Sequence, residues 1–572
     1  MSRSSRKRDT RTSRKNVAPS TAKRFSALFP IIAAALLAVT VVAYLPAMRG
    51  DFVWDDDDYV SNNPTLRSVE GLRSIWLDPA ATPQYYPLVH TSFWLEYRLW
   101  GLTPTGYHVT NLLLHVGTAI VLWRVLLLLS VPGAWLVAGI FAVHPVHVES
   151  VAWITERKNV LSGVLYLSSM LAYLHFALDA PDRAGRRRVG LYAAACTLFL
   201  LALLSKTMTA TLPAALLLLI AWKRGRVRSR DVWPLLPLFV AGVTMAGVTV
   251  WVERHYVGAQ GIDWQLSPLD RSVIAGRALW FYAAKLIWPT NLTFIYPRWQ
   301  VDAADPAQLA YPLAAVATIV ALWLARRRIG PGPLVAVLFF AGTLFPALGF
   351  FDIFPMRYSF VADHFQYLAS IGLIALGVAV GTRVIQRWAP ARAWASPALA
   401  AILVLVLATL TWRQSHVYAD QETLWRDTVE KDPGSWMGHT CLGALLGRRG
   451  DDVDAEYHYR EAVRLNPNFA IGRLNLGTRL ATDGRYDEAI PHLREAVRLE
   501  PSLLDANLSL GMALLFDGQP EEAASWLRAA AERWPQEPRI QNFLQQALAA
   551  ENRRESRPPR DPEDRRRRAL AR

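Results

Sequence analysis

Cysteine is almost missing from the 572-residue chain, which contains Cys196 and Cys441 and no other thiol. Cys196 lies in an apolar block, whereas Cys441 lies in the polar C-terminal part. Two cysteines in such different surroundings exclude the disulfide framework that stabilises many small secreted domains.

Charged residues are also scarce outside the flanks and loops. Hydrophobic residues make up 52% of the chain and 22 residues are Trp, which excludes a chain of ordinary soluble domains. The apolar residues form blocks of about 17–25, a length that crosses a bilayer core. The net charge of +15 is concentrated in flanks and loops, which indicates membrane orientation and not nucleic-acid binding. We therefore expect an integral multi-pass membrane protein that binds membrane lipids and no nucleic acid.

The N-terminus is poor in acidic residues, and its apolar run is too long for a cleaved signal peptide. Residues 1–26 contain nine Lys or Arg and one Asp. The apolar run that follows exceeds the region of about 7–15 residues in a signal peptide. Residues 1–26 are therefore predicted to be a basic cytoplasmic tail, and 27–48 the first membrane span.

The positive-inside rule orients the rest of the membrane domain, residues 27–412. It places the long loop 49–107 outside. Segment 272–289 contains Arg277 and Lys285 and is predicted to be re-entrant or interfacial, because a crossing there would put the run "ARRR" outside. The predicted spans, about eleven in number, are 27–48, 109–129, 134–151, 159–178, 188–204, 207–222, 232–251, 309–324, 333–350, 366–382 and 395–412.

Residues 413–550 contain a repeat with a period of 34 residues. The period is typical of tetratricopeptide (TPR) repeats, in which small residues let paired helices approach and proline ends the second helix. We predict a half-repeat, three full repeats and a capping helix near 537–549, followed by a disordered, Arg- and Pro-rich basic tail at 551–572. The fold class is therefore all-α, a polytopic helical bundle followed by a TPR solenoid. The recurring residues are Pro433, Pro467, Pro501 and Pro535, then Gly443, Gly477 and Gly511, then Gly450, Gly484 and Gly518.

Ionisable residues gather at the predicted outer ends of the membrane helices, where such residues are usually functional. An enzyme that uses a lipid-phosphate-linked sugar needs a carboxylate base and cations that hold the phosphate. The pattern predicts Asp55 or Asp56 as the base. The predicted phosphate and head-group contacts are Arg157, Lys158, Lys206, Arg357, Asp363 and His364, and other candidates on the same face are His144, His147 and Glu149.

Each candidate also has a structural explanation. The run Asp55–Asp58 could be a solvated charge cluster, although the apolar residues before it favour a fixed position near the membrane surface. Its last two residues could cap a helix. Lys and Arg side chains at helix ends often extend to the interface. His144, His147 and Glu149 could either hydrogen-bond between helix ends or hold a divalent metal, although their spacing matches no standard motif.

Several motifs resemble those of the transmembrane-and-TPR O-mannosyltransferases and their bacterial relatives, which are GT-C membrane glycosyltransferases. The motifs are "FVWDD", "HPVHVESVAWI", "RKNVLSG", "LLSKTMTATLP" and "ADHFQYLASIG", and with the TPR array they extend the resemblance over residues 25–550. The resemblance implies inverting transfer of mannose or another hexose from a polyprenyl-phosphate donor to Ser or Thr of exported proteins. The acidic pair of the family falls on Asp55 and Asp56. Its Lys-Glu pair is replaced here by Lys206 and Thr207, and its Arg-Tyr pair by Asp363 and His364.

Two other functions are compatible with this sequence. One is a membrane-anchored TPR scaffold without activity, and the other is a transporter of lipid-linked sugar. Transporters favour charged sites at mid-membrane between internal repeats, whereas these charges lie at one surface. We expect an enzyme of the bacterial inner membrane whose active site and TPR domain face the periplasm. Acceptor proteins would bind the TPR groove, and no cofactor is predicted beyond the lipid-linked donor and an optional divalent metal.

Overall fold

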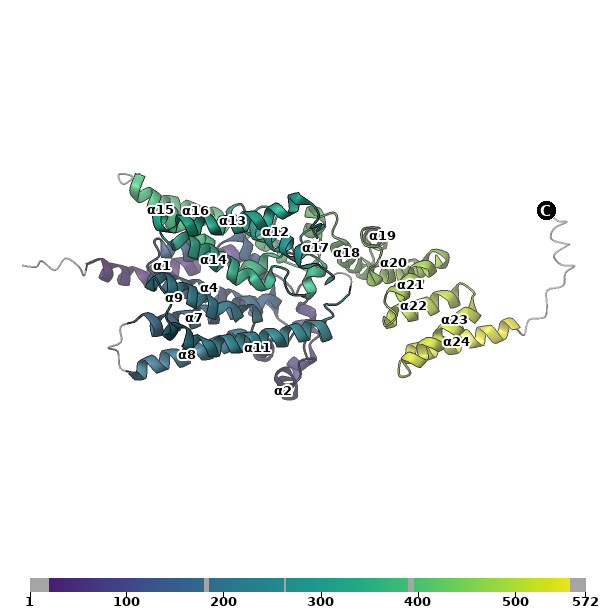
Figure 1. The fold of residues 1–572 in the computed structure, drawn as a ribbon. Coiled ribbons are helices and arrows are strands. Elements are labelled where there is room, and N and C mark those ends of the chain that lie inside the picture. Colours follow the sequence, from purple (N-terminus) through teal and green to yellow (C-terminus); the bar gives the residue numbers. More distant parts are fainter. Residues whose placement is uncertain (1–19, 180–184, 262–263, 389–395, 556–572) are drawn as a thin grey trace, which may run out of the picture.

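The chain forms helices throughout the part that the computed structural model describes, and no β-strand occurs there. The described residues are 20–179, 185–261, 264–388 and 396–555. The all-α prediction is therefore confirmed. Most of the predicted basic tail, most of the predicted disordered C-terminal tail, and parts of two basic loops lie outside the described residues. Figure 1 shows two parts, a bundle of long helices and a row of paired helices that extends from one end of it.

The bundle is formed by helices that follow the predicted apolar blocks closely. α4 packs against α7, α7 against α8, α14 against α15, and α1 against α16, so the first and last helices of the bundle are neighbours. The bundle helices are α1 (Ser20–Tyr44), α4 (Pro104–Leu128), α5 (Ala134–Ala142), α6 (Val148–Ala152), α7 (Arg157–Leu178), α8 (Gly185–Leu203), α9 (Leu212–Arg224), α11 (Leu236–Val252), α12 (Pro268–Ile287), α13 (Pro306–Ile329), α14 (Gly332–Leu344), α15 (Ser370–Trp388) and α16 (Ser396–Ser415).

Among the described residues, six helical stretches are long and apolar enough to cross a membrane, and a seventh is counted if α5 and α6 form one broken span. The predicted number of about eleven spans stays a prediction. The segment predicted to be re-entrant or interfacial forms the continuous helix α12, which packs against α13 and is not among these six stretches. The outer loop contains two further helices, α2 (Val69–Leu77) and α3 (Pro87–Trp100).

The break between α5 and α6 determines where the candidate site lies. The sequence predicts one span over 134–151, but the helix ends at Ala142 and the chain turns by 55°. Pro145 opens a short 3₁₀ turn at this point, because its ring cannot continue the helical hydrogen bonds. The turn carries the residues that follow, including Glu149, into the interior of the bundle.

The row of paired helices has the predicted period. α17 (Gln421–Lys431) precedes three helix pairs, and α24 (Pro538–Glu555) follows them. Glycine permits the close packing within each pair: a Cβ atom on Gly511 would lie 2.4 Å from Leu527 Cδ2, and one on Gly477 would lie 2.7 Å from Leu493 Cγ. The pairs are α18 (Trp436–Arg449) with α19 (Asp452–Leu465), α20 (Ala470–Thr482) with α21 (Tyr486–Leu499), and α22 (Leu504–Phe516) with α23 (Pro520–Arg533).

Candidate active site

The aspartate run forms a tight loop at the end of the bundle that adjoins the repeats. Trp54 adopts a left-handed backbone conformation with φ of +51°, which is uncommon for a residue other than glycine. Asp56 is buried, and its carboxylate accepts hydrogen bonds from the backbone N–H of Val53 (2.9 Å) and from the backbone N–H (2.7 Å) and hydroxyl (2.6 Å) of Thr155. Burial raises the pKa of Asp56 to about 7, although these hydrogen bonds act in the opposite direction. Asp56 therefore anchors the loop to residue 155.

Asp55 lies on the other side of the loop and lines a chamber of about 320 Å³. Burial raises the pKa of its carboxyl to about 6. Lys158 and His364 act against this rise, while Asp58 and Glu156 add to it. A carboxylate with a pKa near neutrality is well suited to take a proton from a hydroxyl group. Of the two adjacent aspartates, Asp55 lines the chamber, whereas the carboxylate of Asp56 accepts hydrogen bonds from Val53 and Thr155.

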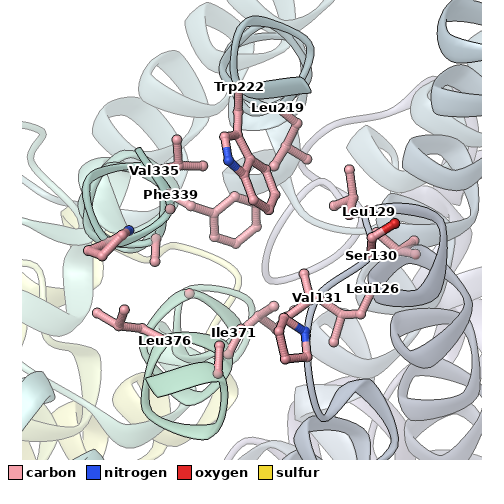
Figure 2. Close-up of a pocket in the computed structure, with 18 of the residues that line it drawn as sticks. Leu126, Leu129, Ser130, Val131, Leu219, Trp222, Val335, Phe339, Ile371 and Leu376 are labelled. Carbon is pink, nitrogen blue, oxygen red and sulfur yellow. The ribbon is translucent and has the colours of Figure 1, made fainter. Parts of the chain in front are cut away.

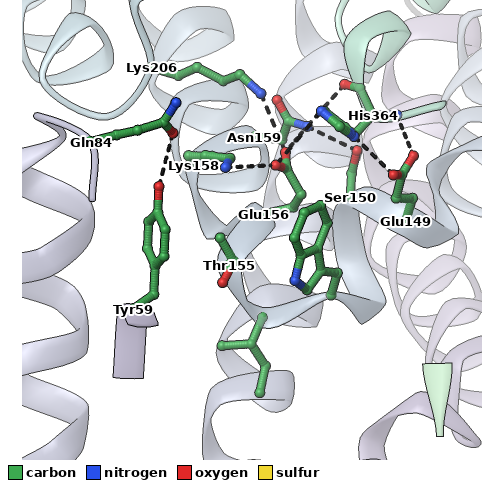
Figure 3. Close-up of polar contacts among 12 residues, drawn as sticks. Tyr59, Gln84, Glu149, Ser150, Thr155, Glu156, Lys158, Asn159, Lys206 and His364 are labelled. Carbon is green, nitrogen blue, oxygen red and sulfur yellow. Dashed lines mark hydrogen bonds and ion pairs between the residues drawn. The ribbon is translucent and has the colours of Figure 1, made fainter. Parts of the chain in front are cut away.

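Glu156 is the residue on which the cations of the chamber converge (Figure 3). Its Oε1 lies 3.0 Å from Lys158 Nζ, and its Oε2 lies 3.3 Å from Lys206 Nζ. The amide of Asn159 donates a 2.5 Å hydrogen bond to Oε2. Burial lowers the pKa of Lys206 to about 8. Sequence reasoning missed Glu156, although an acid directly before two basic residues at a helix start was a usable signal.

Lys206 finds its acidic partner across the fold and not next to it in sequence. The residue after it, Thr207, donates or accepts a hydrogen bond with Thr249 (2.6 Å). The related family has a glutamate directly after this lysine. Here Glu156, fifty positions earlier in the chain, is the acidic partner of Lys206.

His364 completes the polar cluster from the other side of the chamber. Its Nδ1 lies 3.0 Å from Glu149 Oε1, its backbone N–H donates to Glu149 Oε2 (2.8 Å), and its Nε2 lies 3.9 Å from Glu156 Oε1. Asp363 points away into the protein, where Tyr296 donates a hydrogen bond to its carboxylate (3.0 Å). Burial, followed by the nearby charge of Glu149, raises the pKa of Asp363 well above its ordinary value.

The structure does not bring two of the predicted phosphate contacts, Arg157 and Arg357, to the chamber. The buried guanidinium of Arg157 pairs with Glu96 (2.8 Å) and donates to the carbonyl of Tyr107 (2.9 Å) and to Asn111. Arg357 lies over the ring of Phe469, 5.7 Å from its centre, at the boundary with the repeats. Neither arginine is among the residues that line the chamber.

The histidines of the α5–α6 turn hydrogen-bond between helix ends. His147 contacts the carbonyl of Phe141 (2.7 Å) and the hydroxyl of Ser370 (3.0 Å), and His144 contacts the carbonyl of Leu286 (3.1 Å). Within the described ranges, no group of three or more His, Cys, Asp or Glu side chains is placed to hold a metal ion. Of the two explanations given for these histidines, the arrangement matches hydrogen bonding.

An apolar groove of about 700 Å³ adjoins the chamber. Gln84, Lys158 and His364 line both, so the groove and the chamber meet at these residues. Lys206 lies at the same polar end of the groove. From there the groove runs between α9, α11 and α14, and its apolar lining includes Ala210, Ala214, Ala246, Val250, Leu338 and Ala341. Glu253 and Asp352 also line the groove, so its polar residues include carboxylates as well as the two lysines. A long hydrocarbon chain with a phosphate head group near the lysines fits this arrangement.

Another cavity contains none of the candidate residues. It occupies about 140 Å³ between α4, α9, α14 and α15, and the polar side-chain atoms of its labelled lining in Figure 2 are the Ser130 hydroxyl and the Trp222 indole nitrogen. Trp222 and Phe339 project into it. The contrast locates the polar chemistry of the bundle at the chamber.

Comparison with known proteins points in the same direction. The chain is 25% identical over 455 residues to a protein O-mannosyl-transferase of Caenorhabditis elegans, an alignment that covers 74% of this chain and 61% of the relative. It is 26% identical over 498 residues to the human protein O-mannosyl-transferase TMTC1, covering 76% of this chain and 55% of the relative. A 160-residue segment is 36% identical to mouse TMTC1, covering 26% and 17% of the two chains. The homologues of this chain are therefore TMTC-family protein O-mannosyl-transferases.

The repeats are also recognised by comparison. The tetratricopeptide repeat model TPR_16 matches residues 474–538, which confirms the prediction of TPR repeats. The crystal structure of yeast Tom70 aligns with 70% of this chain and 92% of its own at 12% identity, but the TM-score of 0.22 is too low to support any argument. The chain spans 61% or less of the length of the three curated relatives described above.

Proposed function

We propose that this protein is a membrane glycosyltransferase that moves mannose, or a closely similar hexose, from a polyprenyl-phosphate donor to Ser or Thr of proteins. The proposal rests on one observation: the chamber that Asp55 lines opens into the apolar groove, and two lysines lie near the place where the two cavities join. Asp55 lines the chamber, and Lys158 and Lys206 lie where the groove begins. The names of the homologues support the reaction class.

In the proposed reaction, the polyprenyl chain lies in the groove and the phosphate lies near Lys158 and Lys206. The acceptor hydroxyl oxygen attacks the anomeric carbon from the face opposite the phosphate, and its proton passes to Asp55. The bond between the anomeric carbon and the phosphate oxygen breaks. Polyprenyl phosphate leaves with the electron pair, and the lysines stabilise its additional negative charge. The attack from the opposite face inverts the configuration at the anomeric carbon.

The proposal also includes a location. We propose that the chamber and the repeats lie on the non-cytoplasmic side of the membrane, and the basic loops on the opposite side support this orientation. TPR helices commonly bind protein segments, so the repeat array is proposed to hold the acceptor protein. A bacterial inner membrane remains the prediction from sequence.

The test is direct transfer in lipid nanodiscs. The purified full chain is incubated with polyprenyl-phosphate [³H]mannose and a Ser/Thr-rich acceptor protein, and label in the protein fraction is measured. We expect label that β-elimination releases and that is lost in the Asp55→Asn variant. Absence of transfer with mannosyl, glucosyl and galactosyl donors would reject the enzyme. Interaction with partner proteins that survives Asp55→Asn would then favour the inactive TPR scaffold.

A further inference from the structure

The aspartate loop is attached to the repeat array as well as to the membrane helices. The backbone N–H of Asp51 donates to the carbonyl of Ala419 (2.9 Å), just before α17. Gln421, the first residue of α17, donates from its amide to Asp57 Oδ2 (3.3 Å). Both ends of the loop that carries Asp55 are therefore tied to residues that begin the repeats.

An aromatic contact joins the same two segments between these hydrogen bonds. The indole of Trp54 lies edge-on against that of Trp425 in α17, with ring centres 4.8 Å apart. Phe294 packs against both, at 6.2 Å from Trp54 and 5.5 Å from Trp425. Trp425 is buried with 1% of its surface exposed. This is one of the largest fully buried side chains of the described structure, and it lies at the boundary of the two parts.

We infer that Trp425 is a positioning residue for the proposed base, so that the first helix of the repeat array completes the active site. The inference rests on the proposed function and extends it, because it gives the repeats a part in the reaction besides acceptor binding. Trp425 does not line the chamber, and it would act on Asp55 through Trp54.

The backbone of Trp54 explains why such a support is needed. A left-handed conformation at a residue with a bulky side chain persists only where the surroundings hold it. Trp425 and Phe294 hold the indole of Trp54, and Thr155 holds Asp56. Asp55 lies between these two supports. Without Trp425, the backbone of Trp54 can relax toward an ordinary conformation, and the carboxylate of Asp55 then leaves its place in the chamber.

The kinetic test compares Trp425→Leu with the conservative Trp425→Phe and with Trp526→Leu, which changes a partly buried tryptophan of α23 far along the array. We expect Trp425→Leu to lower kcat about 10–100-fold, as for a slightly misplaced catalytic group, with little change in KM for the donor. Trp425→Phe should recover most of kcat, and Trp526→Leu should keep it.

The acid limb of the pH–rate profile should move to lower pH in Trp425→Leu, because a hydrated Asp55 loses the pKa rise that burial causes.

Equal losses of kcat in Trp425→Leu and Trp526→Leu would overturn the inference, because they would indicate general destabilisation of the repeats. Full activity of Trp425→Leu with an unchanged pH profile would overturn it as well. Lack of transfer by the unmodified protein would instead reject the proposed function.

A readout without activity separates these two failures. In a Cys196→Ala, Cys441→Ala background, the Asp55→Cys variant is labelled with a small maleimide. We expect Trp425→Leu to speed labelling at least about tenfold over Trp425→Phe, because the site opens to water. Unchanged labelling would show that α17 does not hold the loop, whatever the chain catalyses.

Discussion

The membrane bundle and the repeat array use charged side chains in opposite ways. In the bundle, the charged pairs around the chamber are buried: Arg157 and Glu96, for example, have 0% and 7% of their side chains exposed. In the repeats they lie at the surface, as for Arg460 and Glu488, with 43% and 45% exposed. A buried pair leaves an uncompensated charge when one partner is removed, whereas exposed partners are solvated by water. The comparison suggests that charges in the bundle are each required, and that those of the repeats can be exchanged.

The largest effect is expected at the proposed base. Asp55→Asn should lower transfer about 10²–10⁴-fold, the usual contribution of a general base, because the amide cannot take the hydroxyl proton. Expression and membrane insertion should stay unchanged. Asp51→Asn, in the same loop but exposed, is the control and should keep activity. Similar mild losses in both variants would mean that the loop is only a charge cluster.

Removal of Glu156 tests the buried cluster as a stabilising unit. Glu156→Ala leaves Lys158 and Lys206 without their acidic partner and should cost about 3–5 kcal/mol of unfolding free energy. Reversible unfolding in mixed micelles measures the loss. Glu156→Gln combined with Lys206→Met, which removes two of the charges together, should recover part of it. A cost below about 1 kcal/mol for Glu156→Ala would show that these buried charges of the bundle contribute as little to stability as the exposed ion pairs of the repeats.

Apolar packing, and not charge, should dominate the stability of the repeats. Gly511→Ala places a methyl group 2.4 Å from Leu527 Cδ2 and should cost about 1–3 kcal/mol by overpacking. Gly447→Ala is the matched control, since its nearest neighbour would lie at an ordinary 3.6 Å. That variant should be neutral or slightly stabilising. Thermal unfolding of the full chain in detergent distinguishes the two, and equal midpoints would argue against close helix approach at Gly511.

The pH dependence of transfer tests the environment of Asp55. The base works when it is ionised, and its pKa is raised to about 6 by burial. Activity should therefore fall below pH 6, reaching about one tenth for each further unit of pH. Initial rates between pH 4.5 and 8 at saturating donor measure this limb. An acid limb near pH 4 would mean that Asp55 is open to water during catalysis.

The smallest effect is expected in the exposed ion pairs of the array. Glu488 contacts Arg460 and Arg485 at the surface, and Glu488→Ala should leave the unfolding midpoint unchanged within error. Added salt should have no larger effect on the unmodified chain than on the variant. A clear fall in the midpoint would show that the surface pairs act as a network.

The sequence predicted the repeats more completely than the chamber. The period of Pro433, Pro467 and Pro501 fixes the helix pairs, because each unit contacts mainly its neighbours. Among the candidate site residues, Lys158 and His364 line the chamber together with Asp55. Lys206 lines the adjoining groove. The direction in which a side chain points was not predictable, because it depends on contacts between segments distant in the chain.

Two cases illustrate the limit. Arg157 and Lys158 are neighbours, yet one pairs with Glu96 behind the site and the other lines the chamber. The importance of Glu156 became visible only when Lys206 was found beside it.

By itself, then, the sequence determined the all-helical architecture, the TPR period and the face on which ionisable residues gather, since these follow from hydropathy, spacing and charge bias along the chain. Only the tertiary structure gives Asp55 and Asp56 different surroundings. The carboxylate of Asp56 accepts hydrogen bonds from Thr155, ninety-nine positions away, whereas Asp55 lines the chamber. Adjacent side chains of one type differ only in the partners that folding brings to them, and no local pattern encodes those partners.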